Sequence, residues 1–128
     1  MTQEYIDTTD ENFAVFKAET ERLRREIGLD DVFKFITECA PCQEEPSNAE
    51  LGVNLEQRKV WLRLNKRQPV GYTSPEWMKY NARHEFAHAF LLPLANLAWS
   101  RFVTEEEIAA AEHEVVNRLV RLFERLIT

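Results

Sequence analysis

Hydrophobic and polar residues recur at helical spacing over the first part of the chain. Thr9 or Asp10 can cap such a helix, and Gly28 stands where a left-handed residue commonly follows the last turn. The pattern therefore predicts a first helix that ends at Gly28. The apolar residues on its buried face are Phe13, Phe16, Leu23 and Ile27.

The pattern changes to alternation in the middle of the chain. Residues 32–37 are rich in β-branched and aromatic side chains and favour a strand, although their apolar spacing also suits a helix. Residues 49–55 and 60–64 each alternate between apolar and polar positions, and residues 56–59 can turn the chain between them. The sequence thus predicts a three-stranded sheet that contains one hairpin.

The rest of the chain has a helical pattern. Ser74 as N-cap and Pro75 in the first turn begin a helix that runs to about residue 92, where Pro93 stops it. A last helix begins at Thr104, whose hydroxyl forms a capping box with Glu107. The apolar stripe of this helix comprises Ile108, Val115, Leu119, Leu122 and Leu126. The expected fold class is α+β.

Length and charge narrow the possible functions. At 128 residues and 45% hydrophobic content, the chain suits one domain over residues 1–128. Sixteen basic and twenty-two acidic residues give a net charge of −6, the wrong sign for binding nucleic acid. Apolar runs are far shorter than the roughly 20 residues that span a bilayer, and the polar start is unlike a signal peptide. We expect a cytoplasmic protein with no nucleic-acid or membrane partner.

The helix that begins at Pro75 carries an H-E-x-x-H pattern at His84, Glu85 and His88. Imidazoles four residues apart lie about 40° apart around a helix, so both can bind one metal ion. The spacing suits zinc, which lowers the pKa of a bound water, and Glu85 would take the proton as the water attacks a carbonyl. Alternatively, both are core histidines that bond to carbonyls or carboxylates.

A catalytic zinc usually has three protein ligands. Glu112 lies about 40° from Ile108 on the last helix, inside the apolar stripe, where a zinc ion would offset the cost of burying a carboxylate. It could instead pair with an arginine or sit at a partly exposed edge of the stripe. Weaker candidates for the third ligand are Glu107, Glu114 and His113, and candidates for stabilising an oxyanion are Tyr72, Tyr80, His113 and Arg118.

The motif residues and a glutamate on the following helix resemble the gluzincin branch of the zincin metallopeptidases. The order of elements is similar to that of the single-domain minigluzincins, and the motif also resembles small metallopeptidase domains that cleave phage-type repressors. The resemblance implies a zinc-dependent metallopeptidase, a peptide or protein substrate, and an outer strand that pairs with it. We assign that strand to residues 60–64, where Trp61 and Arg63 would flank the cleft or belong to an ordinary half-exposed face. The implied ligands are His84, His88 and Glu112, with Glu85 as general base.

Two other function classes stay open. A zincin scaffold can bind zinc and act as a non-catalytic inhibitor or adaptor. A predicted strand also leads into Cys39, Pro41 and Cys42, an arrangement found at thioredoxin-like redox sites. A hairpin follows where that fold needs a long helix, so two loop thiols, or half of a metal site, are simpler interpretations. The sequence specifies neither the substrate nor the oligomeric state.

Overall fold

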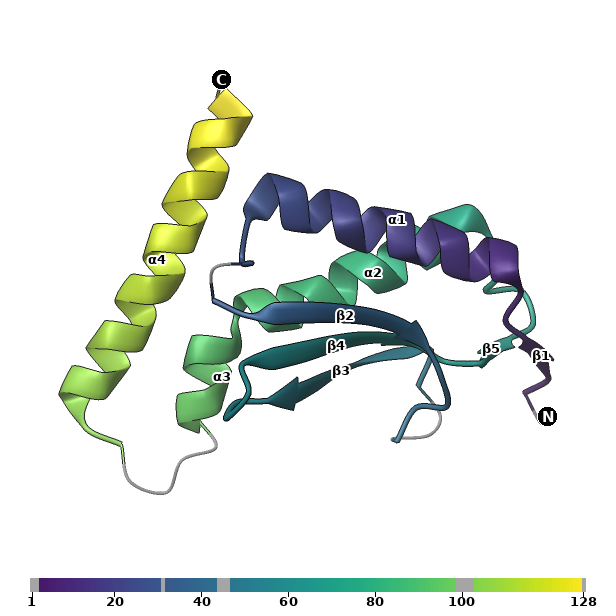
Figure 1. Ribbon diagram of the computed structural model, residues 1–128, viewed down its shortest axis with the longest axis horizontal. Helices are drawn as coiled ribbons and strands as arrows, with labels where there is room; N and C mark the ends of the chain where they lie inside the picture. Colours follow the sequence, from purple (N-terminus) through teal and green to yellow (C-terminus); the bar gives the residue numbers. More distant parts are fainter. Residues whose placement is uncertain (1–2, 31, 44–46, 99–102, 128) are drawn as a thin grey trace. The chain divides into compact units, whose positions relative to one another are not determined.

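The computed structural model describes residues 3–30, 32–43, 47–98 and 103–127, with side chains as far as residue 125. The described residues have a mixed α+β fold in two compact units, Met1–Phe86 and Ala87–Thr128. In chain order the elements are β1 (Tyr5–Asp7), α1 (Asp10–Ile27), β2 (Lys34–Cys39), β3 (Ala49–Asn54), β4 (Lys59–Leu64), β5 (Arg67–Pro69), α2 (Pro75–Phe90), α3 (Leu92–Ala98) and α4 (Glu105–Ile127) (Figure 1).

Helix α1 begins and ends as the sequence predicts. The Thr9 side chain accepts a hydrogen bond from the backbone N–H of Asn12, whose side chain accepts one from the N–H of Thr9. This reciprocal cap satisfies two N–H groups that the helix leaves unpaired. Gly28 follows the helix with φ of 72°, a left-handed conformation in which glycine has no steric cost.

The larger sheet has the strand order β2-β4-β3. Strands β3 and β4 form the predicted antiparallel hairpin, with Ala49 opposite Leu64, whereas β2 runs parallel to β4 with Lys34 opposite Lys59. The prediction that residues 60–64 form an outer strand is therefore wrong, because β4 pairs on both sides. Its inward residue Leu62 is fully buried, as suits a central strand. The edge next to β4 is β3.

Strand β2 covers residues 34–39 instead of the predicted 32–37. The backbone N–H groups of Val32 and Phe33 both bond to the carbonyl of Leu29, so a turn occupies the first predicted positions. Phe35 then faces the helices, where its ring stacks on Phe86 of α2 at a centroid distance of 5.5 Å. The strand prediction is confirmed with a shift of two residues.

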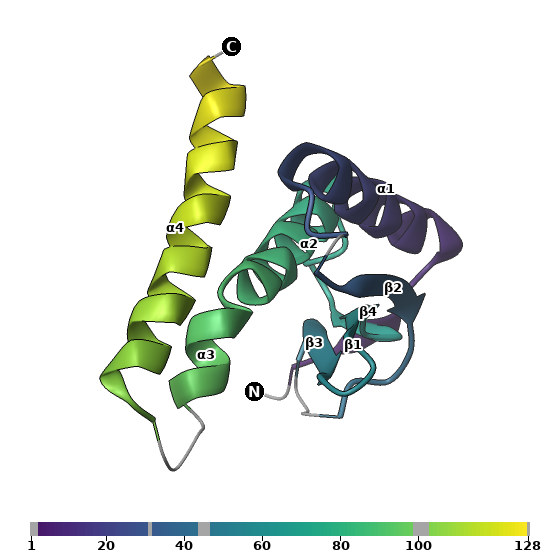
Figure 2. The ribbon, with the colours of Figure 1, turned by 60° about the vertical axis from the view of Figure 1, so that its left-hand side comes forward.

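Helices α1 and α2 cover one face of the β2-β4-β3 sheet (Figure 2). The Thr20 hydroxyl of α1 meets the Thr37 hydroxyl of β2 at 3.1 Å. On the opposite face, Arg63 forms ion pairs with Glu38 and Glu50. Trp61 and Arg63 thus lie on the face away from the helices and do not flank a cleft beside α2. The buried core between sheet and helices includes Phe16, Leu29, Phe33, Phe35, Val60, Leu62, Leu64, Met78, Ala82 and Phe86.

A second sheet pairs two short strands that the sequence does not reveal. β1 runs antiparallel to β5, with Ile6 opposite Gln68. The Gln68 side chain is fully buried, and its Nε2 donates to the carbonyls of Asn48 and Asn65 at 2.8 and 3.1 Å. Residues 65–69 therefore continue as structure beyond the hairpin.

The second unit contains the end of α2, then α3 and α4. The N–H of Leu91 bonds to the carbonyls of Ala87 and His88, and α3 begins one residue later. Helix α2 thus ends at Phe90, close to the predicted end at about residue 92. Pro93 does not prevent a new helix, because it lies in the first turn of α3, where a missing N–H costs little. Thr104 caps α4 as predicted, since its hydroxyl accepts from the N–H of Glu107 at 3.1 Å.

The buried line of helix α4 includes Val115 of the predicted stripe but not Ile108. Ala111, Val115 and Arg118 are buried, whereas Ile108 is 48% exposed. The side chain of Leu126 lies outside the described residues. Arg118 donates to the carbonyls of Ala89 and Phe90 at 3.3 and 2.7 Å and so satisfies carbonyls at the end of α2. None of the helices in the described residues combines the length and the apolar composition that a membrane-spanning helix needs.

Candidate metal centre

The helix that carries the motif begins at a well-formed cap. The Ser74 hydroxyl accepts from the N–H of Trp77 at 3.2 Å, and the Ser74 carbonyl accepts from Met78 at 3.0 Å. Met78 and Ala82 are fully buried and orient α2 against the sheet. Positions three or four residues apart share a helix face, so this burial also fixes the direction of the motif residues.

His84, Glu85 and His88 come together on two successive turns of α2. Each offers one ligand atom, and these atoms lie within 4.8 Å of one another. Both histidines are exposed, whereas Glu85 is 7% exposed. Imidazole nitrogens and carboxylate oxygens are ligand types that zinc prefers in proteins. These three donors suit a metal ion, and because the two histidines are exposed, a ligand could reach that ion from solvent.

The environment of Glu85 disfavours a charge on its carboxylate. Burial and, to a smaller extent, the nearby carboxylate of Glu50 together raise the pKa of Glu85 from 4.5 to about 7. A buried carboxylate needs a positive partner or a proton, because removing its charge from water costs free energy.

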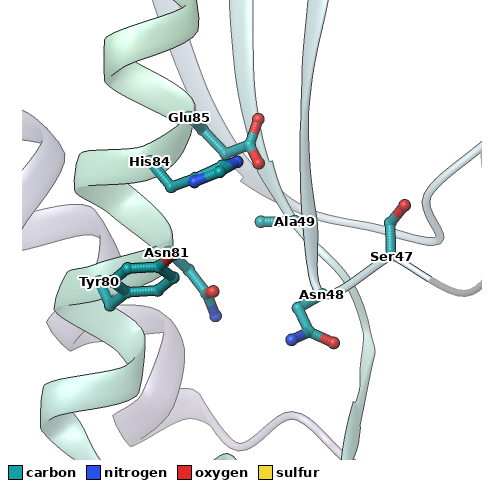
Figure 3. Close-up of a pocket in the computed structure, with 7 residues that line it drawn as sticks. All are labelled: Ser47, Asn48, Ala49, Tyr80, Asn81, His84 and Glu85. Carbon is teal, nitrogen blue, oxygen red and sulfur yellow. The ribbon is translucent and has the colours of Figure 1, made fainter.

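A pocket of about 210 Å³ lies beside the motif. One wall is α2, and the other is the segment that leads into β3, the edge strand of the sheet. The side chains of Asn81, His84 and Glu85 project from α2 toward this segment (Figure 3). The lining residues are Ser47, Asn48, Ala49, Tyr80, Asn81, His84 and Glu85.

Asn81 is a pocket residue that sequence reasoning missed. The residue is 6% exposed, and its amide nitrogen Nδ2 has no hydrogen-bond partner among the described residues. A buried donor without a partner is rare in folded proteins and costs about 1–3 kcal/mol. The signal available in the sequence was a polar residue one turn before His84, between the apolar residues Met78 and Ala82. Asn81 therefore offers a hydrogen bond to whatever fills the pocket.

Two buried amides hold the opposite wall in place. The side-chain nitrogen of Asn65 donates to the carbonyl of Ser47 at 2.6 Å, and that of Gln68 donates to the carbonyl of Asn48 at 2.8 Å. The N–H of Asn65 also donates to the carbonyl of Asn48 at 3.0 Å. These bonds fix a loop backbone from outside the pocket, as supporting residues do around binding sites.

The candidates for a third ligand lie on α4. Glu112 is exposed, so the predicted core-facing position in a buried stripe is not observed. The Glu107 carboxylate contacts the Thr104 hydroxyl at 3.2 Å, and Glu114 forms an ion pair with Arg118. His113 is exposed. The role of Glu112 as a ligand stays a prediction.

The candidates for stabilising an oxyanion have different surroundings. Tyr80 lines the pocket, and its ring lies 5.8 Å from that of His84. Arg118 is buried, and its hydrogen bonds to carbonyls give it a structural role at the end of α2. Tyr72 contacts the ring of Trp77. Tyr80 is thus the candidate that the fold brings to the motif.

The two cysteines lie near the end of β2. Cys39 is half-buried and Cys42 is buried, and neither forms a disulfide. Burial raises the pKa of the Cys39 thiol. Reactive cysteines have lowered pKa values, because the thiolate is the nucleophile. This environment does not favour a redox role.

Comparison with known protein families, curated proteins and solved structures finds no significant match to this chain.

Proposed function

We propose that the protein is a zinc-dependent metallopeptidase with a gluzincin-type site on a small zincin-like fold. The observation that carries this proposal is the close grouping of His84, Glu85 and His88 beside a pocket that an edge strand borders. A helix with this motif next to a free strand edge is the arrangement that the zincin resemblance implies.

Each motif residue has a distinct role. His84 and His88 would hold zinc through ring nitrogens. Zinc supplies Lewis acidity at such a site and lowers the pKa of a coordinated water. Glu85 accepts a proton from the attacking water and passes it to the leaving amine nitrogen. Its side chain projects into the pocket, where both transfers would occur (Figure 3).

The substrate would lie along β3. An edge strand presents N–H and C=O groups that can pair with an extended peptide. Because β4 occupies the centre of the sheet, this role passes from residues 60–64 to β3. The unpartnered Nδ2 of Asn81 would donate to a peptide carbonyl in the pocket.

Glu112 remains our first candidate for the third ligand. Glu107 and Glu114 already interact with Thr104 and Arg118, whereas no such contact holds the Glu112 side chain among the described residues. Zinc content of the alanine variants at residues 107, 112, 113 and 114 ranks the four candidates.

The first test measures metal content. The purified protein should contain about one zinc per chain, and His84→Ala should contain almost none, because one imidazole cannot replace two. Glu11→Gln, an exposed change in α1, serves as a control and should keep its zinc. A wild-type protein that binds no zinc at neutral pH would refute the proposal.

The second test separates an enzyme from a zinc-binding adaptor. Glu85→Gln should keep zinc and lose peptide hydrolysis by at least about 10²-fold, because the amide cannot accept the proton. Glu11→Gln should hydrolyse peptides at the wild-type rate. Wild-type protein that holds zinc but hydrolyses no peptide would instead support the non-catalytic adaptor.

A further inference from the structure

Three aromatic rings follow one another from the segment before α2 along the first turns of this helix, and they lead to the motif. The centroid of Tyr72 lies 4.8 Å from that of Trp77, and Trp77 lies 5.6 Å from Tyr80. The ring of Tyr80 lies 5.8 Å from that of His84. A continuous row of ring contacts thus runs from the residues before α2 to a proposed zinc ligand.

These rings are exposed, unlike the rings of the core. Tyr72, Trp77 and Tyr80 are 40%, 36% and 53% exposed, whereas Phe16 and Phe86 are at most 2% exposed. A single exposed aromatic residue needs no explanation, but a contiguous group often marks a binding surface. The row therefore points to a ligand with a side chain that packs on aromatic faces.

A pocket of about 400 Å³ opens on this row, and we call it the aromatic pocket. Among the described residues, Glu76, Trp77 and Tyr80 line it. Glu76 lies in the first turn of α2, and within the described part of the chain it forms no ion pair. The pocket therefore combines two aromatic faces with an available negative charge.

This combination selects a cation with an apolar stem. Aromatic faces attract a guanidinium or ammonium group through the ring quadrupole, and the methylene stem packs on the same rings. The Glu76 carboxylate adds a charge-assisted hydrogen bond. A purely apolar side chain would instead remove that carboxylate from water without compensation. Arginine fits best, because its planar group can stack on a ring and bond to the carboxylate together.

We propose that the aromatic pocket binds the side chain of an arginine or lysine residue in the peptide substrate. Tyr80 lines both this pocket and the one that holds His84 and Glu85, so the bound side chain lies next to the motif. That the ligand is a substrate rests on the proposed peptidase function, whereas binding of the cation does not.

The experiment compares two probes that differ in charge. Nα-acetyl-arginine methylamide and its neutral citrulline counterpart are titrated into isotope-labelled protein, and amide and indole N–H shifts are followed by NMR. The arginine probe should shift residues 76–80 and the Trp77 indole, and the citrulline probe should bind about three- to tenfold more weakly. Equal binding of both probes, or shifts confined to other residues, would overturn the proposal.

A second experiment measures how substitutions in the aromatic pocket change the affinity for the arginine probe. Glu76→Gln and Trp77→Leu should each weaken the arginine probe about three- to tenfold, and both positions are exposed, so the fold should persist. Glu11→Gln is the matched control, because Glu11 is also an exposed glutamate in the first turn of a helix. A Glu76→Gln variant that binds the arginine probe as the wild type does would refute the role of the carboxylate.

Hydrolysis assays keep this proposal distinct from the proposed function. If peptides are cleaved equally with arginine or citrulline, the peptidase stands and the aromatic pocket is refuted as a specificity site. If the arginine probe binds through Glu76 but no peptide is cleaved, the pocket stands and the peptidase is refuted.

Discussion

Outside the motif, the side chain of Asn81 gives the clearest indication of a ligand. Its buried Nδ2 lacks a partner among the described residues, so the folded protein bears a cost that a ligand can remove. Residues that lower stability without a ligand often do so because they serve binding. Gln68 also has a buried atom without a partner among the described residues, Oε1, but its Nε2 holds the Asn48 carbonyl, so the burial of Gln68 has a structural reason that does not depend on a ligand.

Asn81→Leu should therefore separate stability from function. Leucine has a similar volume and removes the unpaired donor, so the free energy of unfolding should stay the same or rise by about 1 kcal/mol. Peptide hydrolysis should fall about tenfold in kcat/KM, because the substrate loses one hydrogen bond. Urea unfolding and steady-state kinetics measure the two effects. Asn81→Ser, a smaller donor, is the control and should keep part of the activity; unchanged kcat/KM in Asn81→Leu would exclude a role in substrate binding.

At the scale of elements, Glu19 joins the two helices of the first unit. Its carboxylate on α1 forms ion pairs with Arg22 and with Arg83 of α2, the latter at 2.8 Å. The hydrogen bond from Arg22 lowers the pKa of Glu19 below 4.5, against the opposing effect of burial, and Arg83 contributes in the same direction. Arg83 directly precedes His84, so this link acts at the motif.

The lowered pKa of Glu19 determines how its contribution to the free energy of unfolding changes with pH. A carboxylate with a lower pKa in the folded state stabilises the fold above its unfolded pKa, near 4.5, and that contribution is lost as the pH falls through the lowered value. Glu19→Gln should cost about 1–2 kcal/mol at pH 7 and less below pH 4. Chemical unfolding of the wild type and of Glu19→Gln at several pH values measures the loss of stability at pH 7 and below pH 4. Glu11→Gln is the control and should leave the profile unchanged; equal losses at pH 3 and pH 7 would contradict the assignment.

Elements whose signals are local could be predicted from the sequence. Caps at Thr9, Ser74 and Thr104 depend on residues within one turn, and the histidine spacing of the motif is a property of a single helix. The parallel pairing of β2 with β4 and the β1–β5 sheet depend on residues far apart in the chain. Two site features, the Ser47–Asn48 wall and the burial of Asn81, depend on these pairings and escaped prediction.

At the scale of the whole molecule, charge influences which ligands approach. The net charge of −6 attracts cationic ligands and repels anionic ones, and the carboxylate of the aromatic pocket acts in the same direction. This field is screened over about 10 Å at 0.1 M salt. Long-range attraction therefore depends on ionic strength, whereas packing on the rings does not.

Salt should distinguish these two contributions. Between about 0.01 and 0.3 M sodium chloride, the dissociation constant of the arginine probe should rise about two- to fivefold, and that of the citrulline probe should hardly change. The NMR titration described above measures both. Glu76→Gln should reduce the salt effect, whereas equal salt dependence of the two probes would show that charge does not contribute to binding.

The Glu19–Arg83 pair also has an energetic consequence for the site. The pair adds to the buried contacts of Met78 and Ala82, which orient α2, so the rotation of α2 about its own axis is set when the chain folds. The backbone of α2 is therefore already ordered before a ligand binds, and it loses little conformational entropy on binding. Binding should leave the α2 backbone in place.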